Sequence, residues 1–188
     1  MDFTPTILDW FKVPYPKYSL NGQQARLTGK SLLPLAANPS DPSFDHVFSS
    51  HDFHEVTMSY PMRVLRNDRY RLIHNINYRA AFPLATDLFS CPTYQDILQR
   101  TKTGQPTHWF KTLDQYYYRA EWELYDLLTD PKELNNLAYD PDHRTIFREM
   151  NQTLFSWQVE TNDHWRCMPH SILLGTQCHN MYNHEETY

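Results

Sequence analysis

The residues most able to do chemistry stand together in the segment His51-Asp52-Phe53-His54-Glu55. Two imidazoles and two carboxylates at this spacing can ligate a metal ion or transfer protons near neutral pH. The segment is not the zinc motif H-E-x-x-H, because Val56 and Thr57 follow Glu55. Its composition also fits a polar loop that leads into a sheet, and this simpler interpretation is favoured. Loops at strand ends nevertheless hold many site residues.

The three cysteines are candidates for a catalytic nucleophile and for a disulfide bond. Cys91 is followed by Pro92-Thr93-Tyr94-Gln95, where only the start of a short helix could lower its thiol pKa, so a buried or idle cysteine is favoured. Cys167 and Cys178 close a short loop in a polar tail. From spacing alone, a disulfide in a secretory compartment and two free thiols in the cytosol remain equally open.

The remaining motifs are weak. Gly29-Lys30-Ser31 matches the end of a phosphate-binding loop, but Gln24 stands where that motif has its earlier glycine. Asn151-Gln152-Thr153 is a glycosylation sequon, a pattern that also arises by chance. Four histidines crowd the tail at spacings that fit no zinc ligand set, which favours a solvated tail: His164, His170, His179 and His184.

Hydrophobic periodicity predicts the elements that must position these residues. Residues 55–78 alternate around a polar turn at Asn67-Asp68, which predicts a β-hairpin with one covered face. Residues 123–127 are typical of an edge strand. Residues 142–159 predict a helix whose apolar face repeats at helical spacing: Ile146, Met150, Leu154 and Trp157.

Shorter elements are predicted from capping residues. Helices are expected at residues 5–11, with Thr4 as N-cap, and at residues 93–99, with Thr93 as N-cap. Residues 116–119 fit a further strand or a helix end. After residue 160 we expect a polar and irregular chain.

Composition and charge exclude some classes of partner. The 188 residues suffice for one domain or slightly more, and a 15% aromatic content argues against disorder. The net charge of −5, without a run of basic residues, disfavours nucleic acid. No stretch approaches the roughly 18 apolar residues that span a bilayer, so no membrane is expected. No signal peptide opens the sequence, so the chain taken literally would stay in the cytosol, whereas a fragment would have left its signal behind.

Two stretches carry a family resemblance. Residues 123–138 match the signature E-L-Y-D-x(3)-D-P-x-E-x(2)-N-L-A near the end of many sulfatases, through Glu123-Leu124-Tyr125-Asp126, Asp130-Pro131-Lys132-Glu133 and Asn136-Leu137-Ala138. The narrower run from His54 to Arg63 resembles the sulfamidases, a group within that family, as do residues 71–75, 104–107 and 116–120. The resemblance covers almost the whole chain.

This resemblance implies a fold of the α+β class. Residues 36–188 would form the small C-terminal sulfatase domain, an antiparallel sheet of about four strands packed by a long C-terminal helix. Residues 1–35 would be the end of the large alkaline-phosphatase-like α/β domain. The resemblance also implies that Cys167 and Cys178 are disulfide-bonded and that Cys91 is free.

The resemblance implies a function as well. Sulfamidases remove the N-linked sulfate from terminal glucosamine of heparan sulfate in the lysosome, using a calcium ion and a formylglycine made from the Cys of a C-x-P-S-R motif. Cys91 does not fit that motif, and no residue here matches the nucleophile or the calcium ligands, so the chain alone is expected to be inactive. The complete enzyme is expected to be a homodimer.

His54 and Glu55 are the residues expected to bind substrate, because they lie in the run that most resembles the sulfamidases. A carboxylate can accept hydrogen bonds from sugar hydroxyls, and an imidazole can donate to a hydroxyl or a sulfate oxygen. The alternative is that both residues only hold the loop in place, for instance by pairing with Arg63.

Two other functions stay open. The chain could be a non-enzymatic, sulfatase-derived protein that binds glycans or a partner. It could also be a small metal-dependent hydrolase that uses His51, His54 and Glu55. An upstream coding sequence that continues in frame into C-x-P-S-R would favour the sulfamidase, and an assay on a sulfated glucosamine would test the hydrolase.

Overall fold

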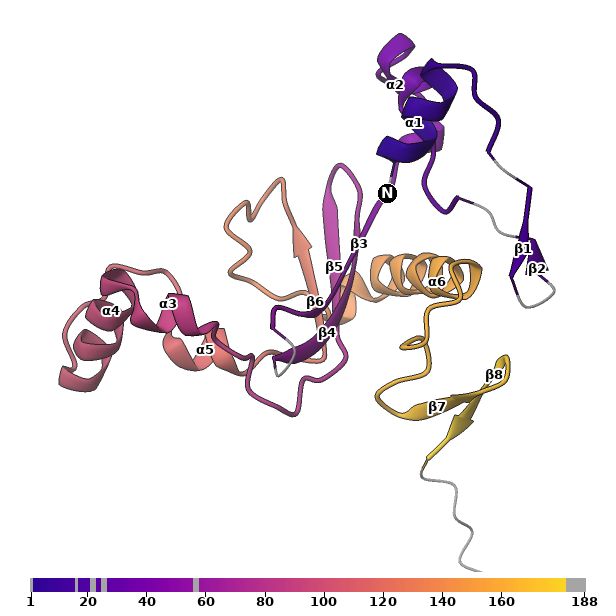
Figure 1. Ribbon diagram of the computed structural model, residues 1–188. Coiled ribbons are helices and arrows are strands. Elements are labelled where there is room, and N and C mark those ends of the chain that lie inside the picture. Colours follow the sequence, from indigo (N-terminus) through magenta and orange to yellow (C-terminus); the bar gives the residue numbers. More distant parts are fainter. Residues whose placement is uncertain (1, 16, 21–22, 25–26, 56–57, 182–188) are drawn as a thin grey trace, which may run out of the picture. The chain divides into compact units, whose positions relative to one another are not determined.

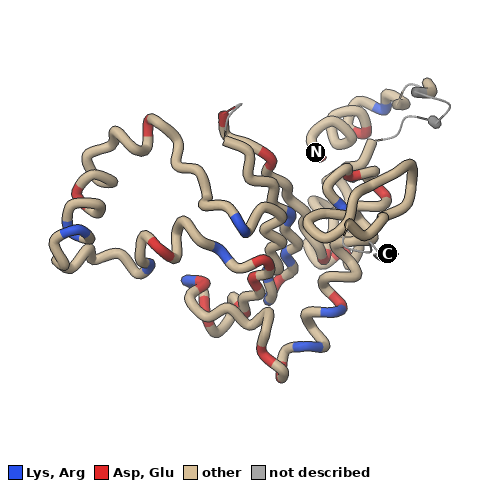
Figure 2. The backbone as a smooth tube through the Cα atoms, turned by 90° about the horizontal axis from the view of Figure 1, so that it is seen from below, with Lys and Arg blue, Asp and Glu red and all other residues tan. Residues whose placement is uncertain are grey.

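The structure is a computed structural model that describes residues 2–15, 17–20, 23–24, 27–55 and 58–181 (Figure 1). The chain divides into two compact units, residues 1–46 and 47–188. None of the described helices is both long and apolar enough to cross a bilayer. Acidic and basic residues are interspersed along the described chain (Figure 2).

The first unit is built around a short helix. It contains α1 (Phe3–Trp10), β1 (Ser19–Leu20), β2 (Gln23–Gln24), α2 (Leu33–Ala37) and the 3-10 turn η1 (Pro42–Phe44). Asp2, not the predicted Thr4, occupies the N-cap position. The helix can begin before Pro5 because the first-turn N–H groups have no partner within the helix, so a proline there costs no hydrogen bond.

A four-stranded antiparallel sheet organises the second unit, in the order β3 (Val47–Phe53), β4 (Ser59–Arg66), β5 (Tyr70–Asn75) and β6 (Trp122–Asp126). The predicted hairpin is confirmed as β4 and β5. Asn67 shapes its turn by accepting hydrogen bonds from the backbone N–H groups of Arg69 and Tyr70, at 3.0 and 2.6 Å. Of this predicted segment, residues 56–57 lie outside the described residues.

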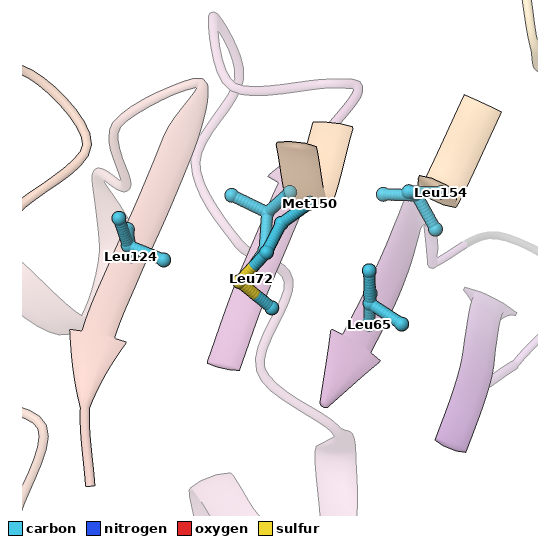
Figure 3. Packing of buried hydrophobic residues seen from close by; sticks show 5 residues of the cluster. All are labelled: Leu65, Leu72, Leu124, Met150 and Leu154. Atoms are coloured by element: carbon cyan, nitrogen blue, oxygen red, sulfur yellow. The ribbon is translucent and has the colours of Figure 1, made fainter. Parts of the chain in front are cut away.

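Helix α6 (Arg144–Glu160), preceded by the 3-10 turn η2 (Pro141–His143), covers one face of the sheet. The predicted apolar face is confirmed, since Met150 and Leu154 are buried while Ile146 and Trp157 pack at the margin of the core. Figure 3 shows Met150 and Leu154 against three leucines from successive strands: Leu65, Leu72 and Leu124. Side chains alternate across a strand, so residues 71, 73, 123 and 125 face the opposite side of the sheet.

The edge strand β6 is held by the segment that carries the sulfatase-like signature. The Asn136 side chain accepts a hydrogen bond from the Leu124 amide at 2.9 Å and donates one to the Trp122 carbonyl at 2.9 Å. Asp126 binds Arg69 at 2.8 Å. The two Asn136 contacts satisfy backbone groups that an exposed edge would leave unpaired. Asn136 and Asp126 of the signature therefore stabilise the fold.

Three short helices follow β5: α3 (Thr86–Ser90), α4 (Pro92–Thr103) and α5 (Leu113–Tyr117). The prediction of Thr93 as N-cap is wrong, because Cys91 holds that position and Pro92 is the first helical residue, where its fixed φ suits the helix. Of the two options for residues 116–119, the structure has the helix end, since α5 ends at Tyr117.

The tail is more regular than predicted. Strands β7 (Ser171–Leu174) and β8 (Gln177–Asn180) form a hairpin with Gly175 at φ 61° in its turn. A disulfide joins Cys167 to Cys178, across a sequence separation of 11 residues. The two strands have only four residues each and are largely exposed, so the sequence carries no clear alternation to announce them.

Candidate functional site

The segment 51–55 straddles the end of strand β3. The prediction of a loop is wrong for His51 and Asp52, which lie within this strand. The strand was missed because its sequence, VFSSHDF, lacks the apolar alternation of a half-buried strand, and its pairing with β4 supplies its order. His54 and Glu55 follow the strand, are exposed, and lie in a turn where the Met58 amide donates to the Glu55 carbonyl at 2.8 Å.

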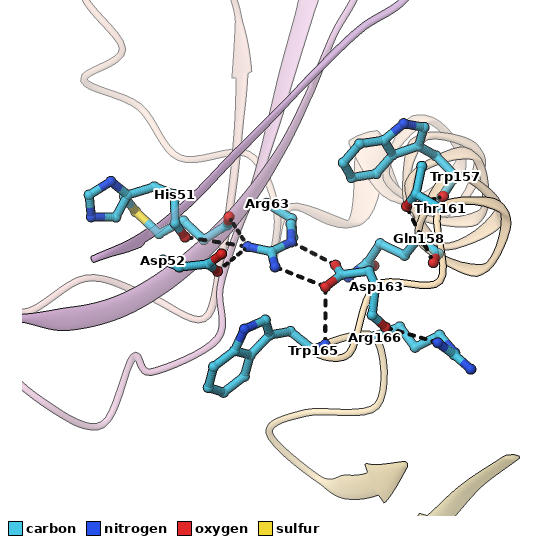
Figure 4. A network of polar contacts seen from close by, with 10 residues as sticks. His51, Asp52, Arg63, Trp157, Gln158, Thr161, Asp163, Trp165 and Arg166 are labelled. Carbon is cyan, nitrogen blue, oxygen red and sulfur yellow. Dashed lines mark hydrogen bonds and ion pairs between the residues drawn. The ribbon is translucent and has the colours of Figure 1, made fainter. Parts of the chain in front are cut away.

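Arg63 on β4 gathers the polar groups next to this segment (Figure 4). Its side chain is buried and binds Asp163 through Nε at 2.6 Å and through Nη2 at 2.9 Å. Its Nη1 reaches Asp52 at 2.8 Å and the His51 carbonyl at 3.3 Å. Among the described residues, the partners of Arg63 therefore do not include the side chains of His54 and Glu55.

This ion pair shifts the pKa values of both partners. Burial by itself raises the pKa of Asp163, but hydrogen bonds from Arg63 and Gln158 outweigh it and hold the pKa below the ordinary 3.8. Burial likewise lowers the pKa of Arg63, and the two carboxylates outweigh it in the other direction. Arg63 thus ties strands β3 and β4 to the residues that follow α6.

A cleft lies on the face of the sheet opposite α6 and has a volume of about 410 Å³. Its floor comes from strands β5 and β6, and its walls come from the segments 110–120 and 133–136. The lining residues that matter below are Arg71, Phe110, Lys111, Tyr118, Arg119, Glu123 and Glu133.

The two carboxylates of the cleft are engaged by neighbouring groups. Glu133 forms an ion pair with Arg71, whose Nη1 donates hydrogen bonds to both carboxylate oxygens, at 2.7 and 3.1 Å. Glu123 accepts hydrogen bonds from Asn75 at 2.6 Å and from the Tyr125 hydroxyl at 2.5 Å. Burial, then the bond to Glu123, raises the pKa of Tyr125, so this hydroxyl remains a proton donor.

Arg119 joins the cleft to the end of strand β3. Its guanidinium lies over the Phe82 ring, at 3.9 Å from the centroid, and its Nη1 is 3.5 Å from the Met62 sulfur. The same Phe82 ring lies 6.4 Å from the His51 ring. The Phe82 ring thus links His51 to Arg119, which lines the cleft.

The other candidate residues are scattered. Cys91 is half-buried at the start of α4, where hydrogen bonds from the Thr93 and Tyr94 amides lower the pKa of its thiol. Asn151 is half-buried within α6. His170 binds Glu121 at 2.9 Å, and His184 lies outside the described residues. In the described part of the chain, no three His, Cys, Asp or Glu side chains are grouped to hold a metal ion.

Comparison with known proteins identifies the family that this chain resembles. A family model described as "N-sulphoglucosamine sulphohydrolase, C-terminal" matches residues 89–160. The chain is 48% identical over 187 residues to N-sulphoglucosamine sulphohydrolase of Homo sapiens, covering 97% of this chain and 37% of that protein. The chain matches the C-terminal portion of the N-sulphoglucosamine sulphohydrolase family. It spans little more than a third of the length of this relative.

More distant sulfatases resemble this chain over less of their length. An ulvan-active sulfatase of Formosa agariphila is 27% identical over 142 residues, which is 73% of this chain and 25% of the relative. This match agrees with the sulfatase signature in residues 123–138.

Solved structures share the fold. One is a protein in complex with its substrate D-glucosamine-2-N,6-O-disulfate, with a TM-score of 0.53, 20% identity, and 86% of this chain and 24% of that chain covered. Another is a 2-O GAG sulfatase, with a TM-score of 0.52, 22% identity, and 89% and 26% covered. The predicted α+β class, with its four-stranded antiparallel sheet and long helix, is confirmed for this chain.

Sequence reasoning missed the cleft and the role of Arg63. Lys111 and Arg119 stood in no motif that marks a site, and Asp163 stands 100 positions after Arg63. The aromatic run at residues 116–118 was a usable signal, because aromatic side chains beside an arginine often line binding surfaces.

Proposed function

We propose that this chain is the C-terminal part of a lysosomal sulfamidase that hydrolyses N-sulfate groups of glucosamine in heparan sulfate. The observation that carries the proposal is the 48% identity to the human N-sulphoglucosamine sulphohydrolase, which extends over 97% of this chain. A solved neighbour whose substrate is a glucosamine disulfate gives weaker support, because it shares only 20% of its sequence.

Because the chain spans 37% of its human relative, we assign the functions of the complete enzyme to two parts, this chain and the part outside it. In the complete enzyme, residues 1–35 would end the large domain and residues 36–188 would form the small one. The nucleophile and the calcium ligands would come from the part of the enzyme outside this chain. The described residues do not fit a calcium site, since no group of metal-ligating side chains is present among them. We therefore expect no catalytic step from this chain alone, and a homodimer only for the complete enzyme.

His54 and Glu55 would contribute substrate contacts to the complete enzyme. Both are exposed next to the end of β3, and the partners of Arg63 in the described structure are Asp52 and Asp163. The Glu55 carboxylate would accept hydrogen bonds from sugar hydroxyls, and the His54 imidazole would donate to a hydroxyl or a sulfate oxygen. The Cys167–Cys178 disulfide and a glycan on Asn151 would suit passage through the secretory pathway.

A chimera tests the function. The C-terminal portion of the human relative would be replaced by this chain, and release of sulfate from N-sulfated glucosamine would be measured. We expect activity in the chimera and none in the isolated chain, which has no C-x-P-S-R sequence. A chimera that folds, as judged by secretion and a cooperative melt, yet releases no sulfate would reject the proposal. Turnover by the isolated chain would reject the proposal that the nucleophile and the calcium ligands lie outside it.

Glu55→Gln in that chimera tests the substrate contact. We expect kcat/KM to fall by about tenfold, equivalent to roughly 1.4 kcal/mol, while the melting temperature stays unchanged. Glu149→Gln, which removes an exposed carboxylate from α6, is the matched control and should leave both quantities unchanged. A lower melting temperature with normal kinetics would instead assign Glu55 to holding the loop.

A further inference from the structure

The cleft opposite α6 contains two cations that no carboxylate neutralises. Among the described residues, neither Lys111 nor Arg119 takes part in an ion pair, whereas Arg71 is paired with Glu133. The nearest partners of Arg119 are weak ones for a charge: the Phe82 ring, the Met62 sulfur and the Tyr116 carbonyl at 3.4 Å. A half-buried guanidinium in this condition has donors left for an anion.

The charge of the cleft is opposite to that of the chain. Three cations and two carboxylates line it, so it carries one net positive charge, while the whole chain carries −5. Both carboxylates already accept strong hydrogen bonds, Glu133 from Arg71 and Glu123 from Asn75 and Tyr125. An anion in the cleft is therefore attracted to Lys111 and Arg119.

Aromatic side chains complete the lining. Phe110 and Tyr118 border the cleft with 57% and 62% of their surfaces exposed, so each has an aromatic face free to contact a ligand, although the Phe110 ring also touches Trp109. Flat aromatic faces pack well against the C–H faces of a sugar ring. The volume of about 410 Å³ falls within the range of small-molecule sites.

We propose that this cleft binds a sulfated sugar residue, with Arg119 and Lys111 holding the sulfate and Phe110 and Tyr118 packing on the ring. The inference rests on the proposed function only for the choice of glucosamine as the sugar. Arg119 also contacts Phe82, beside His51, so an occupant of the cleft lies on the face of the sheet that leads to the end of β3.

Binding to the 188-residue chain, followed by titration calorimetry or ligand-observed NMR, tests the proposal. The probes are glucosamine N-sulfate, glucosamine and inorganic sulfate. We expect glucosamine N-sulfate to bind at least about tenfold more tightly than either of the others, and more weakly as salt is added. Equal affinity for inorganic sulfate, or no binding of glucosamine N-sulfate by the folded chain, would overturn the proposal.

Substitutions locate the site. Arg119→Gln and Lys111→Gln should each weaken binding by about tenfold, equivalent to roughly 1.4 kcal/mol. Because Arg119 packs on the Phe82 ring, its substitution could also change the local fold, and Lys111→Gln then tests the site independently. Exposed cations away from the cleft give the matched controls, Arg148→Gln on α6 and Lys102→Gln on α4, and should leave affinity unchanged. If control and cleft variants behave alike, the ligand binds elsewhere and the proposal fails. An inactive chimera would count against the proposed function without affecting this binding measurement.

Discussion

Arg63 is a buried arginine that forms ion pairs with two carboxylates, Asp52 and Asp163. Its side chain is only 4% exposed, so removal of its main partner leaves a buried charge poorly compensated. We expect Asp163→Asn to lower the free energy of unfolding by about 3 kcal/mol in urea denaturation. Asp52→Asn is the matched control, because the Asp52 side chain is 43% exposed and should contribute about 1 kcal/mol or less. Equal effects of the two substitutions would contradict this ranking.

The Asp163 contribution should also depend on pH. Because its pKa is lower in the folded chain than the ordinary value, the unfolded chain binds the proton more readily. The stabilisation is therefore complete above the unfolded-state pKa, about pH 4, and is lost as the pH falls through the folded-state pKa. The gap in urea midpoint between wild type and Asp163→Asn should narrow from pH 7 towards pH 3. A constant gap would show that the carboxylate charge is not the stabilising feature.

At the scale of elements, the sheet and α6 are held together by a shared apolar core. Leu154 is fully buried in the core that α6 forms with the three strand leucines. We expect Leu154→Ala to lower the free energy of unfolding by about 2–5 kcal/mol, from lost burial and a cavity. The neighbouring Phe155 is 45% exposed on the same helix, so Phe155→Ala should have a much smaller effect in the same denaturation experiment. The opposite ranking would mean that α6 packs through another face.

At the scale of the whole molecule, helix α1 presents a large apolar surface. Its aromatic residues Phe3 and Trp10 are 77% and 67% exposed, and Phe11, directly after the helix, is 71% exposed. Surfaces of this kind promote association. We expect the chain to associate with rising concentration in sedimentation velocity, and Trp10→Ser with Phe11→Ser to raise the monomer fraction. Leu128→Ser, at a position 71% exposed outside this helix, is the control and should leave association unchanged. A monodisperse wild-type monomer would refute the expectation.

Local periodicity predicted the parts of the fold that local forces dominate. The hairpin of β4 and β5 has alternating side chains and an Asn67 turn, and α6 shows its buried residues at helical spacing. The edge position of β6 also followed from its short apolar run. The family signature could be read from the sequence as well, because it consists of short motifs whose residues bond to nearby backbone groups, as Asn136 does.

Tertiary structure alone decided the rest, because long-range pairing leaves no local periodic signal. Strand β3 is mostly polar and is ordered by its pairing with β4. Arg63 binds Asp163, which lies 100 positions later in the sequence. The cleft is lined by β5, β6 and two connecting segments, so its charged residues come together only when the chain folds. The sequence by itself thus carried the resemblance to the sulfatases and the candidates His54 and Glu55. Packing determined which cations of the cleft remain without a carboxylate partner among the described residues, and these are the ones proposed to bind an anion.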